Sequence, residues 1–372
     1  ANKKKVVLVR LETSPEDITG MKVAQGILTV RGGMTSHAAV VARGMGKCCV
    51  SGAGAINVDY KARTVEIDGV LLHEGDFISL NGSTGEVYNG EVKTKPAEVT
   101  GDFAELMDLC DKYTKLVVRT NADTPHDAEV ARNFGAVGIG LCRTEHMFFE
   151  KEKIKAMREM ILSGTKEGRE KALAKLLPYQ KQDFYGILKA MDGHPVNVRL
   201  LDPPLHEFVP HDLAGQKTMA EEMGISVEEI QKRVNSLSEA NPMLGHRGCR
   251  LGNTYPEITA MQTKAILGAA IQLKKEGFDP QPEIMVPLIG IVNEFDMQEQ
   301  VIRSTAKELF EQEGIEIPFK VGTMIEIPRA ALTADYIAKK AEYFSFGTND
   351  LTQMTFGYSR DDIASFLPVY LE

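Results

Sequence analysis

The pattern of hydrophobic and polar positions divides the chain into two unlike parts. Up to about Tyr88, short β-branched runs alternate with Gly and Asp, a pattern typical of short strands in a small mixed domain. The predicted strands are Val6 to Val9, Ile27 to Val30, Thr64 to Ile67 and Phe77 to Leu80. The segment 14–17, Ser-Pro-Glu-Asp, combines an N-cap, a proline at the first helical position and first-turn acids. We therefore expect a short helix after the first strand.

A polar stretch separates the two parts. Residues 90–100 contain two lysines and a proline without apolar periodicity, as linkers do. A helix from Asp102 to Tyr113 is expected to continue this connection. The predicted domains are thus a small domain over residues 1–90, a linker with its helix over 91–114, and a second domain over 115–372.

Beyond Lys115 the pattern becomes strand, loop and helix, repeated. Each apolar run is nearly continuous, as in a parallel sheet covered on both faces. The six predicted strands are Leu116 to Thr120, Val137 to Leu141, Val196 to Leu201, Glu283 to Pro287, Lys320 to Ile325 and Tyr343 to Phe346. This pattern predicts an α/β fold with a (β/α)8 TIM-type barrel. Eight strands are required and only residues 347–372 follow the sixth, so we expect a barrel truncated after about six strands, in a fragment of a longer protein.

Charged residues follow the predicted strands. In such barrels the carboxyl ends of the strands carry the active site. Arg143 and Arg199 end two strands, and Glu326 and Asp350 lie at or just beyond two adjacent ones. Two converging carboxylates suit Mg²⁺; a general acid/base pair, or simple capping and ion-pair acids, are the alternatives. Guanidinium groups grip carboxylate and phosphate bidentately, so the arginines indicate a substrate that carries both groups.

Other loop residues are weaker candidates. Arg247 and Arg360 could also bind the substrate, but each is equally compatible with a surface ion pair. Because Mg²⁺ avoids imidazole and no zinc spacing is present, we expect structural or hydrogen-bonding roles for the histidines near the strand ends. These are His146, His206, His211 and His246.

His37 is the candidate nucleophile. The run GGMTSHAAVVARGMG, Gly32 to Gly46, follows a predicted strand and opens a helix with Thr35 or Ser36 as N-cap. His37 would then lie in the first turn, where free amides and the helix dipole favour bound phosphate. A neutral imidazole there can attack phosphorus. Taken alone, the motif is equally compatible with a histidine that merely begins a helix. A nucleotide loop is disfavoured, because neither G-x-x-x-x-G-K-S/T nor G-x-G-x-x-G is present.

Composition narrows the class of protein. A chain of 372 residues exceeds the usual size of one core, so at least two domains are expected. The net charge of −9, without a long basic run, argues against nucleic acid or an anionic membrane as partner. No apolar stretch approaches a membrane span and no signal peptide is evident, so we expect a cytoplasmic protein, or an organellar one in a plant or protist. The five cysteines show no C-x-x-C spacing, and neither disulfides nor zinc are indicated.

Six segments carry a family resemblance that covers the whole chain. They are GGMTSHAAVVARG (Gly32 to Gly44), GLCRTEHMFFE (Gly140 to Glu150), LLDPPLHEF (Leu200 to Phe208), NPMLGHRGCRLG (Asn241 to Gly252), MIEIPRAAL (Met324 to Leu332) and FSFGTNDLTQMTFGYSRDD (Phe344 to Asp362). The chain resembles the pyruvate, phosphate dikinase family of phosphoenolpyruvate-utilising enzymes. Phosphoenolpyruvate synthase and enzyme I of the sugar phosphotransferase system share this plan, but GGMTSH and LLDPPLHEF are similar to the dikinase form.

The resemblance implies a swivelling phosphohistidine domain and a barrel that binds phosphoenolpyruvate or pyruvate with Mg²⁺. His37 matches the phosphorylated histidine, and Thr35 the threonine through which a regulatory protein switches off some members. The matched substrate-binding positions are Arg143, Arg199, Arg247, Glu326, Gly347, Thr348, Asn349 and Asp350, of which Glu326 and Asp350 match the metal ligands. The family's ATP-grasp domain has no counterpart before residue 1. No cysteine here stands in the motif of the cysteine that protonates the enolate.

The resemblance also implies the reaction and the partners. Pyruvate and phosphoenolpyruvate would be interconverted through phosphohistidine, coupled in the complete enzyme to ATP and phosphate, or AMP and diphosphate, at a nucleotide domain. A homodimer through the barrel is expected, and this chain alone is expected to be inactive in the full reaction. Alternatives are an enzyme of the synthase or enzyme I type, a metal-dependent barrel aldolase or lyase, and an inactive phosphocarrier or binding fragment. The aldolase alternative leaves the histidine domain unexplained.

Overall fold

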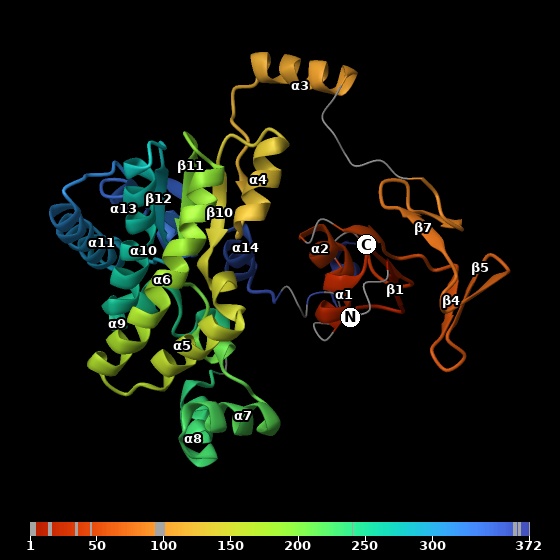
Figure 1. The fold of residues 1–372 in the computed structure, drawn as a ribbon, viewed down its shortest axis with the longest axis horizontal. Coiled ribbons are helices and arrows are strands. Elements are labelled where there is room, and N and C mark those ends of the chain that lie inside the picture. Colours follow the sequence, from red (N-terminus) through yellow and green to blue (C-terminus); the bar gives the residue numbers. More distant parts are fainter. Residues whose placement is uncertain are drawn as a thin grey trace. The chain divides into compact units, whose positions relative to one another are not determined.

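The chain forms two compact units, residues 1–100 and 101–372 (Figure 1). A computed structural model describes residues 5–13, 17–33, 36–44, 47–93, 101–239, 241–359, 363 and 366–371. Each unit has its own core, and each is described separately below.

The first unit is built on a small parallel sheet. Its strands pair in the order β1 (Val7–Arg10), β2 (Gly26–Thr29) and β3 (Cys48–Val50), connected by α1 (Ile18–Val23) and α2 (His37–Gly44). Successive strand residues face opposite sides. Ile27 packs with Met21, Ala38 and Ala42 of the helices, whereas its neighbour Leu28 packs on the other face against the antiparallel strands.

Antiparallel strands complete the first unit. They are β4 (Ile56–Asp59), β5 (Thr64–Ile67) and β6 (Val70–His73) in one sheet, and β7 (Ile78–Asn81) with β8 (Glu86–Asn89) in a hairpin. The β5–β6 turn consists of Asp68 and Gly69, both at positive φ (47° and 79°), as a tight hairpin requires. The sequence analysis predicted the four strands β1, β2, β5 and β7 to within one residue at each end and missed β3, β4, β6 and β8. It also expected the first helix to begin near Ser14, but residues 14–16 lie outside the described part, and Asp17 is the N-cap of α1.

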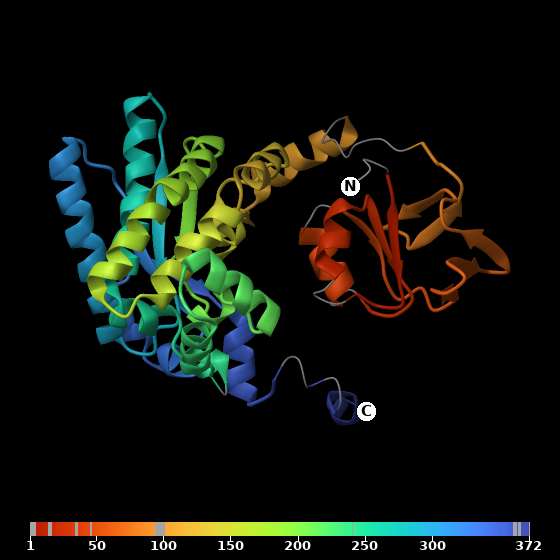
Figure 2. The same ribbon diagram turned by 60° about the horizontal axis from the view of Figure 1, so that its bottom comes forward.

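The second unit holds a six-stranded, all-parallel sheet whose spatial order follows the sequence. The sheet curls as half of a barrel, and Figure 2 shows the long helices running alongside its strands. The strands are β9 (Thr120–Asn121), β10 (Ile139–Arg143), β11 (Pro195–Arg199), β12 (Gln281–Val286), β13 (Lys320–Ile325) and β14 (Phe344–Phe346). This α/β architecture confirms the predicted fold class.

The helices of the second unit lie between and beyond these strands. They are α3 (Asp102–Tyr113), α4 (Pro125–Asn133), α5 (Lys151–Leu162), α6 (Lys166–Ala190), α7 (Leu213–Met223), α8 (Val227–Leu237), α9 (Gly248–Thr254), α10 (Pro256–Lys275), α11 (Val292–Glu313), α12 (Pro328–Leu332), α13 (Ala334–Ile337), α14 (Thr348–Phe356) and α15 (Leu367–Leu371), with 3₁₀ helices at Thr144–Phe149, Leu205–Phe208 and Pro242–Leu244. The predicted helix from Asp102 to Tyr113 is confirmed as α3. Within the described residues, no helix is long and apolar enough to cross a membrane.

One predicted strand is largely wrong. The run from Leu116 to Thr120 forms strand only at Thr120–Asn121, and Leu116 and Val117 are 83% and 68% exposed. Backbone pairing with the neighbouring segment begins only where Val137 N donates to Val118 O (3.1 Å). An apolar run predicts burial, but a strand also needs a neighbouring strand to pair with, and Leu116 and Val117 have none in the part of the chain that the structure describes.

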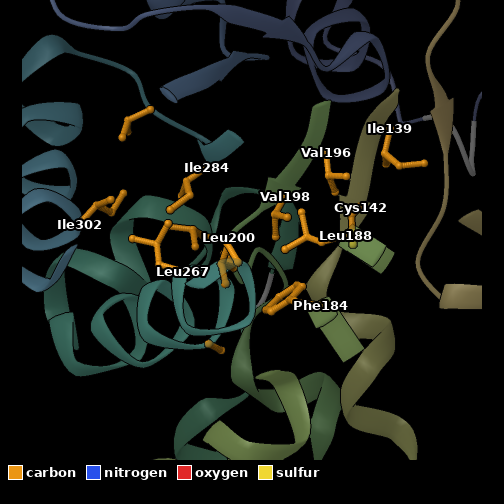
Figure 3. Close-up of a cluster of buried hydrophobic side chains, with 14 of the residues drawn as sticks. Ile139, Cys142, Phe184, Leu188, Val196, Val198, Leu200, Leu267, Ile284 and Ile302 are labelled. Atoms are coloured by element: carbon orange, nitrogen blue, oxygen red, sulfur yellow. The ribbon is translucent and has the colours of Figure 1, made fainter. Parts of the chain in front are cut away.

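The main core lies between the sheet and its helices (Figure 3). Val196 and Val198 of β11 and Ile284 of β12 are fully buried with Phe184 of α6 and Leu267 of α10. A second cluster joins α5 and α6 to the pair α7 and α8, with Met160 and Ile230 at its centre. Burial of such side chains from water is the main favourable contribution to folding.

The opposite face of the sheet carries a polar network. Asn197 alternates with Val196 and Val198, so its side chain points away from the main core. Tyr343 donates its hydroxyl hydrogen to Asn197 Oδ1 (2.9 Å), and Asn197 Nδ2 donates to Gly140 O (3.1 Å). A Cβ at Gly322 would lie 2.5 Å from the Tyr343 ring, so this close approach requires glycine. These contacts join β10, β11 and β13 to the residue that directly precedes β14.

Replacing Leu267 with alanine tests the main core. Leu267 is fully buried, and we expect the Leu267→Ala variant to lose about 2–5 kcal/mol of unfolding free energy, because a cavity remains. Leu332, which is 85% exposed, provides a matched control whose alanine variant should change stability by less than about 0.5 kcal/mol. Urea denaturation measures both; equal losses would contradict the assignment of this core.

Candidate functional site

The carboxyl ends of neighbouring strands place four of the predicted residues at one edge of the sheet. Arg143 ends β10 and Arg199 ends β11, and the two residues are register partners. Glu326 directly follows β13, and Asp350 lies in the first turn of α14, which follows β14. Parallel strands end at the same edge, which explains why residues far apart in sequence meet there.

Asp202 holds two arginines together from the loop after β11. It is 2% exposed, and its Oδ2 lies 3.0 Å from Arg199 Nη1 and 2.5 Å from Arg247 Nη2. Glu145 forms a second, buried ion pair with Arg199. Burial opposes the charge of Arg199, but these carboxylates outweigh it and raise the pKa of the guanidinium. Both arginines are therefore charged and fixed before any ligand binds.

Arg247 extends the cluster to a third element. It is the N-cap of α9, and its Nη2 also lies 3.3 Å from Asp350 Oδ2 at the start of α14. Burial again opposes its charge, but Asp202 and Asp350 raise the pKa of Arg247 above the usual range. The ion pairs of Arg247 do not lie on the open surface, because its partners are the buried Asp202 and the largely buried Asp350.

Glu326 is the carboxylate most affected by its surroundings. It is 2% exposed, and its Oε1 accepts from Leu288 N (2.7 Å). Leu288 holds a positive φ of 65°, an uncommon conformation for this residue type. Burial, together with the negative charges of Asp202 and Asp350, raises the pKa of Glu326 to about 8. Gly347 leaves room for it, because a Cβ there would lie 2.6 Å from Glu326 Oε2.

Arg143 differs from the other two arginines because its side chain is not anchored. Its guanidinium makes no hydrogen bond or ion pair with any residue in the described part of the chain. Its backbone N donates to Asp123 Oδ1 (2.6 Å), and Asp123 Oδ2 lies 2.7 Å from His146 Nδ1. Two neighbouring buried atoms, Glu145 Oε2 and Arg199 Nε, also have no hydrogen-bond partner among the described residues. Within the described residues, the Arg143 guanidinium thus keeps its donors unpaired.

The remaining predicted residues lie at different distances from this cluster. Thr348 and Asn349 form the first turn of α14 beside Asp350. His37 begins α2 in the first unit, and Ala39 N donates to Ser36 Oγ (3.4 Å), which gives Ser36 a capping role. Three other predictions, Thr35, Arg360 and the side chain of His37, lie outside the described part of the structure.

The histidines near the strand ends make contacts consistent with structural roles. His246 Nε2 lies 3.0 Å from Thr254 Oγ1, and the rings of His206 and His211 are 5.9 Å apart. The sequence analysis did not assign roles to Asp123, Glu145 or Asp202. For Glu145 and Asp202 a usable signal was present, namely an acidic residue shortly after an arginine at a strand end. For Asp123 this signal is missing, because Asp123 lies 20 residues before Arg143 in the sequence.

The acidic residues of the cluster could hold a cation. Among the described residues, no group of three or more His, Cys, Asp or Glu side chains is arranged to hold a metal. Glu326 and Asp350 nevertheless interact closely enough to shift the Glu326 pKa upward. Mg²⁺ commonly takes only one or two protein carboxylates and completes its octahedron with water and substrate. The donor set therefore fits a weakly held Mg²⁺.

The raised pKa of Glu326 predicts a pH dependence of stability. The native state binds a proton that the unfolded state has released, so the unfolding free energy should fall as pH rises from about 5 to about 8. In Glu326→Gln this fall should be smaller, whereas Glu308→Gln, on the exposed side of α11, should keep it. Urea denaturation in EDTA at several pH values measures the slopes. A slope unchanged by Glu326→Gln would contradict the pKa shift.

Comparison with known proteins agrees with this geometry. The family model described as PEP-utilising enzyme, mobile domain, matches residues 2–85, and that described as PEP-utilising enzyme, PEP-binding domain, matches residues 97–368. Pyruvate, phosphate dikinases from Clostridium symbiosum and Giardia intestinalis are each 58% identical, over 98% and 99% of this chain and 42% of their own length. A chloroplastic one from Arabidopsis thaliana is 57% identical over 99% of this chain and 38% of its own. The chain spans about two fifths of these relatives, and it belongs to the family of PEP-utilising enzymes.

Proposed function

We propose that this chain is the phosphohistidine and phosphoenolpyruvate-binding part of a pyruvate, phosphate dikinase. The proposal rests mainly on the buried cluster in which Asp202 fixes Arg199 and Arg247 opposite Glu326 and Asp350. Two fixed guanidinium groups and one free one, that of Arg143, suit a small substrate with a carboxylate and a phosphate. The relatives' name and their high identity support the dikinase reaction over the synthase and enzyme I types.

The proposed chemistry is phosphoryl transfer between His37 and pyruvate. An imidazole nitrogen of His37 attacks the phosphorus of phosphoenolpyruvate while the bond to the enolate oxygen breaks, and the released enolate takes up a proton to give pyruvate. Arg143, Arg199 and Arg247 bind the anionic groups and stabilise charge on the phosphoryl and enolate oxygens. The first-turn position of His37 on α2 supports its role, because helix amides there favour phosphate.

Mg²⁺ is the proposed cofactor, held by Glu326 and Asp350. The support is electrostatic: Asp202 and Asp350 repel the charge of Glu326, and a cation would relieve that repulsion. When bound, Mg²⁺ supplies Lewis-acid polarisation of substrate oxygens. Gly347, Thr348 and Asn349 are proposed to line the same site, because Gly347 joins β14 to α14 and the other two lie in the first turn of α14 beside Asp350.

The remaining proposals concern the complete enzyme. Residues 1–90 would act as a swivelling domain, 91–114 as its linker, and 115–372 as the substrate barrel, so that one histidine serves two sites. The second site would bind ATP and phosphate, or AMP and diphosphate, in a nucleotide domain. Dimerisation through the barrel, control at Thr35, and a cytoplasmic or organellar location are further family expectations.

Labelling with phosphoenolpyruvate tests the role of His37. We expect transfer of labelled phosphate from phosphoenolpyruvate to the protein in the presence of Mg²⁺, and its loss in His37→Ala. His73→Ala, which removes a 65% exposed histidine of the same unit, should label normally. The same variants are also assayed in a longer protein that has the full length of the relatives. Label retained by His37→Ala in that protein would contradict the assignment.

The metal proposal is tested through Mg²⁺ titrations. Outer-shell changes commonly weaken metal binding about 10-fold or more, so loss of a direct ligand in Glu326→Gln should raise the half-saturating Mg²⁺ concentration at least that much. Glu308→Gln serves as the control. Turnover measured across a range of Mg²⁺ concentrations gives the half-saturating concentration of each variant. An unchanged half-saturating concentration in Glu326→Gln would show that Glu326 is not a Mg²⁺ ligand.

A further inference from the structure

Asp123 connects two strand ends through one carboxylate. It lies just beyond β9, and its Oδ1 accepts from Arg143 N (2.6 Å) at the end of β10. Its Oδ2 lies 2.7 Å from Nδ1 of His146, in the 3₁₀ helix that follows β10. The Asp123 side chain is 17% exposed and that of His146 is 53% exposed, so the contact with Arg143 N is the better shielded of the two. One side chain thus contacts both ends of the segment 143–146.

The carboxylate acts where the backbone ladder between β9 and β10 stops. Thr120 N donates to Gly138 O (3.0 Å), and Ala122 N donates to Leu141 O (3.2 Å). The next donor on the β10 side, Arg143 N, is taken by the Asp123 side chain instead of a backbone carbonyl. The strand end therefore keeps a fixed partner, although the ladder has ended.

His146 holds the second carboxylate oxygen. The hydrogen bond to Asp123 raises the pKa of His146, as does the charge of Glu145, while burial and Arg143 oppose the increase. Burial opposes the charge on Asp123, but His146 and the Arg143 amide outweigh it and lower the Asp123 pKa. The pair thus favours imidazolium and carboxylate, a charge-assisted hydrogen bond.

We propose that Asp123 is a positioning residue for substrate binding: with His146 as its second anchor, it holds the backbone of segment 143–146 so that the Arg143 guanidinium meets the anionic substrate. The position of the Arg143 guanidinium depends on its backbone, because its side chain has no hydrogen-bond or ion-pair partner among the described residues, unlike those of Arg199 and Arg247. The same segment carries Glu145, the partner of Arg199. A displacement of about 1 Å in a substrate-positioning group can reduce the rate about 100-fold. This inference rests on the proposed function.

Steady-state kinetics with phosphoenolpyruvate test the positioning role of Asp123. They are measured in a longer protein that has the full length of the relatives. Asp123→Ala should raise KM about 10- to 100-fold and change kcat less. Asp123→Asn keeps an acceptor for Arg143 N and should have a smaller effect. His146→Asn keeps a hydrogen-bond donor for Asp123. Its KM should therefore be closer to that of the unsubstituted protein than the KM of His146→Ala is. Asp127→Asn and His126→Asn, at exposed positions on α4, are matched controls and should leave KM unchanged.

Two further measurements separate positioning from general stability. Amide hydrogen exchange across residues 143–146 should accelerate in Asp123→Ala while exchange in the main core stays slow. In a double-mutant cycle, Asp123→Ala should add little to the KM of Arg143→Met, because it acts through that arginine.

The outcomes separate the positioning role of Asp123 from the proposed function. If the unsubstituted protein is active and Asp123→Ala leaves KM unchanged, or raises it equally in the Arg143→Met background, the positioning role is overturned while the function stands. Should the unsubstituted protein neither bind nor turn over phosphoenolpyruvate, the proposed function fails, and the role of Asp123 in it fails as well. Asp123→Asn keeps the test informative if Asp123→Ala does not fold.

Discussion

The ion pairs of Asp202 are the interaction on which the site depends. This carboxylate is 2% exposed and contacts guanidinium groups from β11 and α9. Removing one partner of a buried pair leaves the other charge uncompensated, at a cost of about 3–5 kcal/mol. The same charge raises the pKa of Glu326, two strands away in the sheet. Asp202 therefore couples the anion-binding side of the site to its acidic side.

The curled parallel sheet makes this concentration of charge possible. Hydrophobic side chains fill one face of the sheet, and the Asn197–Tyr343 network occupies part of the other. The charged cluster of the site lies at the edge where the strands end. At that edge the arginines are of two kinds. Arg199 and Arg247 are held by side-chain ion pairs, whereas within the described part of the chain Arg143 is held through its backbone, which contacts β11 and Asp123.

Much of the fold could be predicted because apolar runs and strands coincide when both faces of a sheet are buried. Lys320–Ile325 and Thr64–Ile67 were predicted with their observed bounds. The run at Leu116 failed because its first two residues pair with no strand among the described residues, and β6 was missed although Asp68-Gly69 is a usable hairpin signal. The position of a charged residue at or just after the end of a strand was sufficient to predict that Arg143, Arg199 and Glu326 lie at one edge of the sheet. Asp123 could not be found in this way, because its role depends on a contact 20 residues along the chain.

By itself, the sequence determined the alternation of strands and helices, the charged residues at the strand ends, and the motif around His37, because these follow from local patterns and residue chemistry. Only the tertiary structure decided which charges meet. It gave Arg247 the buried partner Asp202 in place of a surface ion pair, and it raised the Glu326 pKa through neighbours distant in sequence. It also left the Arg143 side chain without a partner among the described residues. These properties depend on burial and on distances of a few ångströms, which are set by packing across the sheet and not by the order of residues along it.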